Sequence, residues 1–151
     1  MNVAREQIYS ALFALLQSAA NFKTVGRVWV PSNKLDPPQL PALFMVENNE
    51  HAMQTAPGRP AKWLLDVDVV IYARNEGESQ APGAESYVRA TALNNLLDAV
   101  ESALAPVAAT NVQSLGGLVQ HCWIEGKIEK DAALQGANSV AVVPVRILTT
   151  G

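Results

Sequence analysis

The sequence predicts an α+β domain in which two helices pack on one face of a mixed, mostly antiparallel five-stranded sheet, in the order α-β-β-β-α-β-β. Three observations predict this class. Two segments, 4–19 and 86–106, repeat apolar residues at helical spacing, and the segment 62–72 alternates with the period of a strand. The chain contains no internal repeat, and its 151 residues fit a single domain, 1–151.

The segment 62–72 is the clearest strand in the chain. Its odd positions are all apolar, from Trp63 to Ile71, whereas its even positions mix apolar side chains with Asp66 and Asp68. Residues that alternate in this way lie on the two faces of a strand, so one face is buried. The opposite face is too apolar for plain solvent and too charged for a core, and such a face often meets another subunit. We therefore predict an interface there.

Two amphipathic helices are predicted, one over 4–19 and one from Ser86 to Pro106. In each, apolar residues recur at i, i+4, i+7 and i+11, with polar side chains on the other side. The stripes consist of Ile8, Leu12, Leu15 and Ala19 in the first helix and Leu93, Leu97, Val100 and Leu104 in the second. We expect both helices to lie on a sheet face.

Four further segments complete the predicted sheet, and they cover 24–30, 42–47, 118–128 and 139–149. Pro31 stops the first of them. Pro144 removes a ladder donor from the last, so that strand should lie at an edge or carry a bulge. The expected connections are a proline-rich loop at 31–41, a polar hairpin tip at 48–61, a loop at 74–85 and a turn region at 129–137.

Composition points to apolar surface that needs covering. Charged residues make up 17% of the chain, below the ~25% typical of soluble proteins. The net charge of -3 and the lack of any Lys or Arg run argue against a surface that grips phosphate backbones. No segment approaches the ~20 apolar residues of a membrane span, and the N-terminal segment lacks the order of a signal peptide. We expect a cytoplasmic protein with no membrane partner.

The two histidines and the single cysteine do not suggest an active site. His51 and His121 have no acidic or cysteine neighbour at metal-ligand spacing. His121 and Cys122 are adjacent on a predicted strand, so their side chains point to opposite faces and cannot act as base and nucleophile. We interpret Cys122 as a small core residue.

Asp66 and Asp68 share one face of the central strand. Paired carboxylates can hold a divalent metal, but no third ligand is evident in the sequence. Charges placed opposite Lys127 or Arg146 are the simpler interpretation of the two aspartates. We expect no enzyme activity, no cofactor and no metal, and a metal-dependent hydrolase is the weakest of our hypotheses.

Six residues are candidates for contacts with another subunit or a partner. They are Arg59, Lys62, Leu64, Asp66, Asp68 and Arg74. The loops at 48–62 and 74–85 are the segments that we expect to become ordered on assembly.

Several stretches carry a resemblance to a known family over nearly the full length. They are REQIYSALFAL (5–15), PALF (41–44), KW and the alternating run after it (from 62), LNNLLDAVE (93–101), and LGGLVQHCWIEG (115–126) followed by VPVRIL (143–148). In this pattern of helices and strands the chain resembles the tail terminator proteins of long-tailed bacteriophages, the minor tail protein U-like family. The last pair of stretches is the most specific part of the match.

The resemblance implies a structural virion protein without catalytic residues. Such a protein forms a homo-hexameric ring that caps the tail tube, terminates its polymerisation and offers the head a joining surface. The implied partners are the tail tube protein and a head-completion or connector protein, and DNA passes through the lumen without sequence-specific binding. The implied location is the neck of the virion, after assembly in the host cytoplasm. The alternative is a small α+β ligand- or peptide-binding module, which a defined pocket with convergent polar groups would favour.

Overall fold

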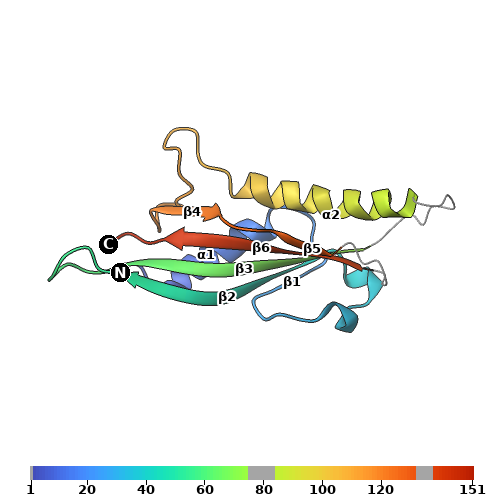
Figure 1. The fold of residues 1–151 in the computed structure, drawn as a ribbon, viewed down its shortest axis with the longest axis horizontal. Coiled ribbons are helices and arrows are strands. Elements are labelled where there is room, and N and C mark those ends of the chain that lie inside the picture. Colours follow the sequence, from blue (N-terminus) through green and yellow to red (C-terminus); the bar gives the residue numbers. More distant parts are fainter. Residues whose placement is uncertain (1, 75–83, 132–137) are drawn as a thin grey trace.

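The computed structural model describes residues 2–74, 84–131 and 138–151 (Figure 1). Its elements are α1 (Arg5–Gln17), β1 (Thr24–Gly26), the 3-10 helices η1 (Ser32–Lys34) and η2 (Pro37–Gln39), β2 (Ala42–Met53), β3 (Lys62–Arg74), α2 (Ala84–Ala103), β4 (His121–Ile124), β5 (Glu129–Asp131) and β6 (Asn138–Leu148). The predicted α+β class is confirmed. Of the loop expected at 74–85, residues 75–83 fall outside the described residues, while Arg74 belongs to β3 and Ala84 begins α2. Most of the turn region expected at 129–137 also falls outside them.

The strands form one sheet in the order β1-β2-β3-β6-β4, and β5 also pairs with β6. β1 runs parallel to β2, whereas the other described pairings are antiparallel, so the sheet is mixed and mostly antiparallel as predicted. It has six strands instead of five. The predicted strand 118–128 shrinks to β4, and β5 begins at Glu129, where a turn was expected.

Pro144 accounts for the break between β4 and β5. It lies opposite Asp68 of β3, so β6 is an inner strand and the first predicted alternative, an edge position, is wrong. The second alternative, a bulge, agrees with the pairing, because residues 125–128 face only residues 143–144 between the two paired segments. The carbonyl of Pro144 accepts a hydrogen bond from the amide of Glu125 at 3.2 Å, so its missing donor also faces the β4 side. There Gly126, with φ 114°, carries the chain past the proline ring. A Cβ at Gly126 would lie only 3.3 Å from Pro144 Cγ. The glycine therefore leaves room for the proline ring at the point where the strand pairing is interrupted.

Both helices pack on the same face of the sheet, as predicted. The core on this face joins the two helix stripes to the odd positions of β3 and β6. Its fully buried members include Ile8, Leu12 and Leu16 of α1, Leu93 and Val100 of α2, Leu65, Val67, Val69 and Ile71 of β3, and Val143, Val145 and Ile147 of β6. The alternation predicted for the central strand therefore holds along its length.

β2 is longer than predicted, because 48–53 pairs with the start of β3 and places Met53 opposite Lys62. A register shift between Glu47 and Glu50 brings Glu50 opposite Leu65 on the helix face. Its carboxylate accepts hydrogen bonds from the Tyr9 hydroxyl at 2.9 Å and from Arg5 Nε at 2.7 Å. The polar residues of this hairpin masked the strand in the sequence, and only 54–61 remains as its turn.

β1 is shorter than predicted, because the chain leaves the sheet edge after Gly26. Arg27 fixes this exit. One nitrogen of its guanidinium, Nη2, donates to the Glu47 carboxylate of β2 at 2.6 Å, and the group also pairs with Glu6 of α1. The segment that follows crosses to the face opposite the helices, so Arg27 joins a helix, a strand and the start of a loop.

Acid should weaken this corner of the molecule. Hydrogen bonds from Arg27 hold the pKa of Glu6 below its usual value of 4.5. The folded state therefore binds this proton less readily than the unfolded chain, and the resulting stabilisation is present above pH 4.5 and lost as the pH falls through the lowered pKa. We expect Arg27→Gln to reduce the acid dependence of the urea unfolding midpoint, measured between about pH 3 and 7. Parallel pH curves for variant and wild type would contradict this.

Candidate subunit interface

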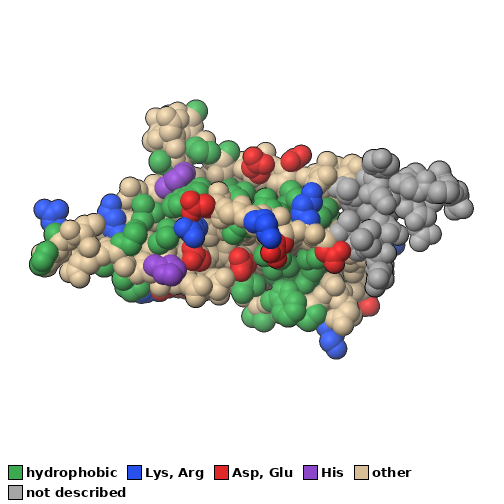
Figure 2. Space-filling view, viewed as in Figure 1, with side chains coloured by type: hydrophobic (Ala, Val, Ile, Leu, Met, Phe, Trp, Pro, Cys, Tyr) green, Lys and Arg blue, Asp and Glu red, His purple; other side chains and the backbone are tan. Residues whose placement is uncertain are grey.

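The face of the sheet opposite the two helices, called the open face below, carries the even positions of β3 and β6. It comprises Lys62, Leu64, Asp66, Asp68, Val70, Tyr72 and Arg74 of β3, Asn138, Val140, Val142, Pro144, Arg146 and Leu148 of β6, and their β2 neighbours Ala42, Phe44, Val46, His51 and Met53. Figure 2 shows this face, where a patch of hydrophobic side chains lies beside a band of charged ones. The predicted mixture of apolar and acidic side chains is confirmed.

The loop 27–41 covers one end of the open face. Leu40 packs there with Ala42, Phe44, Val70 and Tyr72 in a small core that is separate from the one under the helices. The second half of the segment predicted as a strand at 24–30 packs on this face instead of extending the sheet edge. This is why β1 ends at Gly26.

Tyr72 holds the loop in place. Its hydroxyl donates to the Val30 carbonyl at 2.9 Å and accepts a hydrogen bond from Trp29 Nε1 at 2.8 Å. Its ring meets Phe44 edge-on, with centroids 5.9 Å apart. Burial raises the pKa of the Tyr72 hydroxyl, which stays protonated as a donor at neutral pH.

We expect Tyr72→Phe to destabilise the protein by about 1–2 kcal/mol, because the Val30 carbonyl and the Trp29 indole lose their partner while ring packing is kept. A lowered urea midpoint with an unchanged slope would register this loss. If the loop is anchored at this hydroxyl, backbone amides of 28–34 should also exchange faster with solvent. Unchanged exchange there would contradict the anchoring role.

Beside the anchored loop, the open face forms an apolar groove of about 730 Å³. Its lining residues are Trp29, Pro31, Ser32, Asn33, Val46, Asp68, Val70, Tyr72, Val140 and Val142. On the outer wall Trp29 is 52% exposed and its neighbour Val28 is 77% exposed. These two exposed side chains extend the apolar surface of the groove, and large contiguous apolar patches are typical of interaction sites.

A band of ion pairs crosses the open face next to the groove. Asp66 lies between Arg146 Nε, 3.4 Å from its Oδ1, and His51 Nε2, 3.3 Å from its Oδ2. Arg146 also pairs with Glu125 through Nη1 at 2.8 Å. The predicted placement of an aspartate opposite Arg146 is confirmed. Since Asp66 Oδ1 is buried without a hydrogen bond of good geometry, Arg146 holds this carboxylate by charge.

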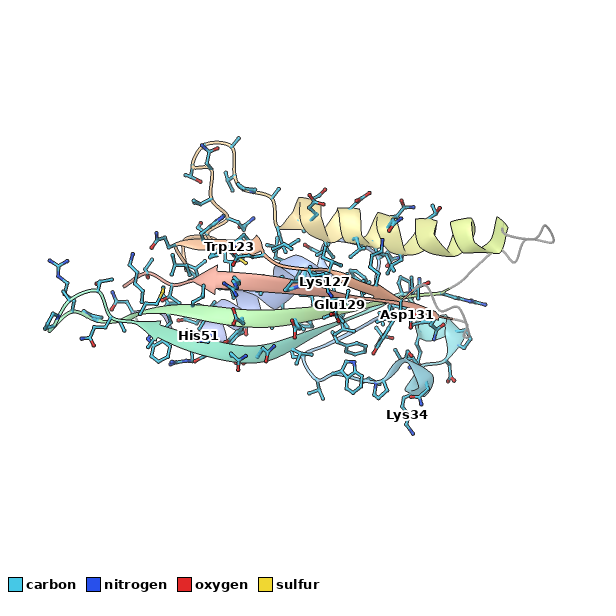
Figure 3. All side chains as sticks on the ribbon, in the orientation of Figure 1. Lys34, His51, Trp123, Lys127, Glu129 and Asp131 are labelled. Atoms are coloured by element: carbon cyan, nitrogen blue, oxygen red, sulfur yellow. The ribbon has the colours of Figure 1, made fainter. Side chains whose placement is uncertain are left out.

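Acidic side chains also border the groove. Asp68 in its lining accepts a hydrogen bond from Asn48 Nδ2 at 3.0 Å. Glu129 and Asp131 of β5 lie opposite Val142 and Val140, which line the groove. Figure 3 places both carboxylates on this side of the sheet.

The six residues predicted as an interface are spread along β3. Lys62, Leu64, Asp66 and Asp68 share the open face. Arg59 is exposed in the hairpin turn, and Arg74 is exposed at the opposite end of the strand. Arg74 is also an even position of β3 and lies at the far end of the open face, whereas Arg59 lies outside the strands.

The sequence revealed only part of the groove, since Asp68 was a candidate interface residue and Val70 and Tyr72 lie on the face predicted to meet another subunit. Val140 and Val142 were predicted as strand residues without a role, and Trp29 was placed in a strand. These residues meet only because 27–41 docks on Tyr72. The available signal was a tryptophan directly before a proline-stiffened loop.

Cys122 and its neighbour His121 lie on opposite faces of β4, as the sequence predicts. Cys122 is fully buried, as predicted, and burial raises the pKa of its thiol to about 12. His121 points to the open face, where its ring stacks on Trp123 with centroids 5.0 Å apart and its Nδ1 accepts the Gln113 amide at 3.1 Å. A thiol with this pKa is not a nucleophile at neutral pH.

Within the described ranges, His, Cys, Asp and Glu side chains form no group of three or more that could ligate a metal. In the same part of the chain, neither helix combines the length and the apolar character needed to cross a bilayer.

No protein-family model matches this chain, and no curated protein matches it in sequence. Among solved structures, it is similar to a chain of the virion of a native gene transfer agent (GTA) particle. That comparison has a TM-score of 0.47 and 13% sequence identity, and it covers 95% of this chain and 92% of that one.

Proposed function

We propose that this protein is a structural virion protein of the tail terminator kind. In this proposal six copies form a ring that caps the tail tube, stops its polymerisation and provides the surface to which the head joins. The observation that carries the proposal is the open face, which holds an apolar groove and exposed Val28 and Trp29. The full-length resemblance to tail terminators supports it independently.

The open face suits a contact between subunits on physical grounds. Burying apolar surface contributes about 25 cal/mol per Å², and an aromatic anchor such as Trp29 often dominates an interface. The neighbouring ion pair between Asp66 and Arg146 forms within one chain and would belong to a polar rim. Five of the six predicted interface residues, Lys62, Leu64, Asp66, Asp68 and Arg74, occupy even positions of β3 and so lie on this face.

The remaining parts of the proposal concern the ring as a whole. We propose a non-enzymatic role, in which the tail tube protein and a head-completion or connector protein are the partners. A weakly acidic chain, with net charge -3, would let DNA slide through the lumen without being held. The proposed location is the neck of the virion, with assembly in the host cytoplasm.

Mass measurement over a concentration series, combined with electron microscopy of mixtures with tail tubes, tests this function. We expect six-fold rings or capped tube ends and tubes of limited length. A protein that stays monomeric with tubes present and leaves their length uncontrolled would overturn the proposal. Replacing Asp66 and Asp68 with Asn should alter assembly alone, whereas loss of a hydrolytic turnover would favour the metal-dependent hydrolase.

The groove also favours a second candidate, a small ligand- or peptide-binding module. Its volume lies within the usual range of ~300–1,000 Å³ for ligand pockets. Apart from the aromatic residues Trp29 and Tyr72, the polar side chains that line the groove are Ser32, Asn33 and Asp68. A screen of apolar amines by amide NMR tests this second candidate. Saturable chemical-shift changes at Val140 and Val142, in a protein that forms no rings, would support it.

A further inference from the structure

The segment 105–114, which follows α2, projects from the body of the molecule (Figure 1). Its two ends are fixed, because Leu104 and Leu115 are buried in the core under the helices. Between them residues 105–111 are exposed, and a bridge between Val107 and Val112 closes the projection on itself. The contacts at the base of the segment therefore decide whether it stays in place.

Gln113 joins this base to the rest of the molecule. Its side-chain Nε2 donates to the carbonyls of Ala105 at 3.1 Å and Ala103 at 3.5 Å, at the end of α2. Its side-chain Oε1 accepts the Leu115 amide at 3.2 Å. Its backbone carbonyl accepts the Cys122 amide at 2.8 Å. One residue thus ties the projection to the last turn of α2 and to the edge of β4.

The base of the segment is also strained. Leu115 has a φ of 52°, in the left-handed region that residues other than glycine rarely occupy. Such a conformation persists only where neighbouring contacts hold it. Burial of the Leu115 side chain is one of these contacts, and the hydrogen bond to Gln113 is another. Loss of the contacts of Gln113 would therefore favour a different position of the segment.

The remaining polar group of Gln113, its backbone amide, donates to Nδ1 of His121 at 3.1 Å. Only an unprotonated ring nitrogen can accept, so Nε2 carries the proton of the neutral ring. In the imidazolium form both nitrogens donate, and the Nδ1 proton would face the amide proton of Gln113. Turning the ring over does not restore the contact, since a carbon then takes the place of the acceptor. Stacking on Trp123, with centroids 5.0 Å apart, also favours the charged ring where it is.

Charged side chains from four elements surround His121. They are Glu101 of α2, Lys62 and Asp66 of β3, Glu125 of β4 and Arg146 of β6. Glu101 lines the same hollow of about 260 Å³ as His121. Arg146 pairs with both Glu125 and Asp66, and Lys62 donates at 2.8 Å to the side chain of the residue before His121. Acidic and basic groups both lie around the ring, so the contact that protonation reverses is the amide hydrogen bond at Nδ1.

We propose that His121 acts as a proton-operated latch for the segment 105–114. The neutral ring accepts the Gln113 amide and holds the segment closed, whereas protonation at Nδ1 releases it. Histidine side chains generally change charge between about pH 5 and 8, so mild acid opens the segment. Release exposes the Cys122 amide of β4 and the last carbonyls of α2 to water. The latch belongs to the single subunit, so it goes beyond the proposed ring and does not depend on it.

An NMR titration of the wild-type protein from about pH 7.5 to 5 tests the latch. Ring signals report the protonation of His121. Hydrogen exchange reports the protection of the Gln113 amide, relative to an unstructured chain at the same pH. Protection should fall on the order of 10-fold as His121 gains its proton, because the amide loses its acceptor. A His121 ring that stays neutral at the acid end, or protection that is unchanged after protonation, would overturn the proposal.

Two variants of His121 separate its proton from its ring. His121→Asn keeps an acceptor near the position of Nδ1 and cannot gain a proton, so the Gln113 amide should stay protected throughout the titration. His121→Phe keeps a ring that can stack on Trp123 and removes the acceptor, so protection should be low throughout. Thermal unfolding checks that each variant folds, and His121→Asn decides if His121→Phe does not. A pH response that persists in folded His121→Asn would refute the latch.

His51→Asn is the matched control. His51 lies in the same row across the sheet, separated from His121 by Leu64 and Leu148. Its ring pairs with Asp66 at 3.3 Å and has no part in the contacts of Gln113 described above. The pH response of Gln113 should be unchanged in this variant. If the response is lost while the protein stays folded, the proton that opens the segment is not that of His121 and the proposal fails.

Discussion

Val69→Asp should abolish folding. Val69 is fully buried in the central strand, with Met45 and Val143 directly opposite it on the two neighbouring strands. An ionised carboxylate there would have no partner, and the effective penalty for burying an unpaired charge is several kcal/mol. Loss of the valine from a close-packed core adds to this. Since small domains are stable by about 5–15 kcal/mol, the change should remove most or all of that stability.

Circular dichroism and the dispersion of amide NMR signals would measure the result. The control is the neighbouring position, Asp68→Val, whose side chain lies on the open face and loses one hydrogen bond to Asn48. That variant should fold. A folded Val69→Asp protein, or two variants of equal stability, would contradict the assignment of the two faces of β3.

Val142→Glu should abolish assembly while the protein stays folded. Val142 is half-buried in the groove, and its new carboxylate could reach water at the groove mouth in a single subunit. In an assembled ring, the neighbouring copy would cover that charge, and Glu129 directly opposite would repel it. We expect association to weaken on the order of 100-fold, with a loss of stability of about 1–2 kcal/mol in the subunit.

Sedimentation or mass measurement over a concentration series, paired with thermal unfolding, separates these two effects. Val107→Glu is the matched control, because it makes the same exchange at a residue that is 52% exposed in the segment after α2. A folded Val142→Glu protein that forms rings and caps tubes as wild type does would show that the groove is not covered during assembly.

Local patterns in the sequence predicted the parts of the fold that depend on local geometry. The face of β3 that bears Trp63 to Ile71 could be assigned because strand periodicity requires no knowledge of neighbours. The two helix stripes were assigned for the same reason. Leu15 and Leu97 are only partly buried, since they lie at the margins of the helix stripes, and Ala19 lies beyond the end of α1 at Gln17.

Parts of the structure that depend on distant segments were not predicted. The run 24–30 has strand composition along its length, but after Gly26 the chain packs on Tyr72 across the sheet. Polar residues at 48–53 form a strand only because they pair with 62–65 in a hairpin. The open face was predicted as an interface, whereas its groove was not, because the groove exists only where the docked loop meets β2, β3 and β6.

The lateral margins of the sheet restrict how copies can meet. One margin is β1, with three residues, and the other consists of β4, with four, and β5, with three. On β4 the Cys122 amide already donates to the Gln113 carbonyl at 2.8 Å. Exposed backbone at such margins recruits strands from other chains and nucleates fibrous aggregates, and short or occupied margins suppress this. The short margins therefore disfavour edge-to-edge aggregation in a protein that is proposed to terminate a polymer.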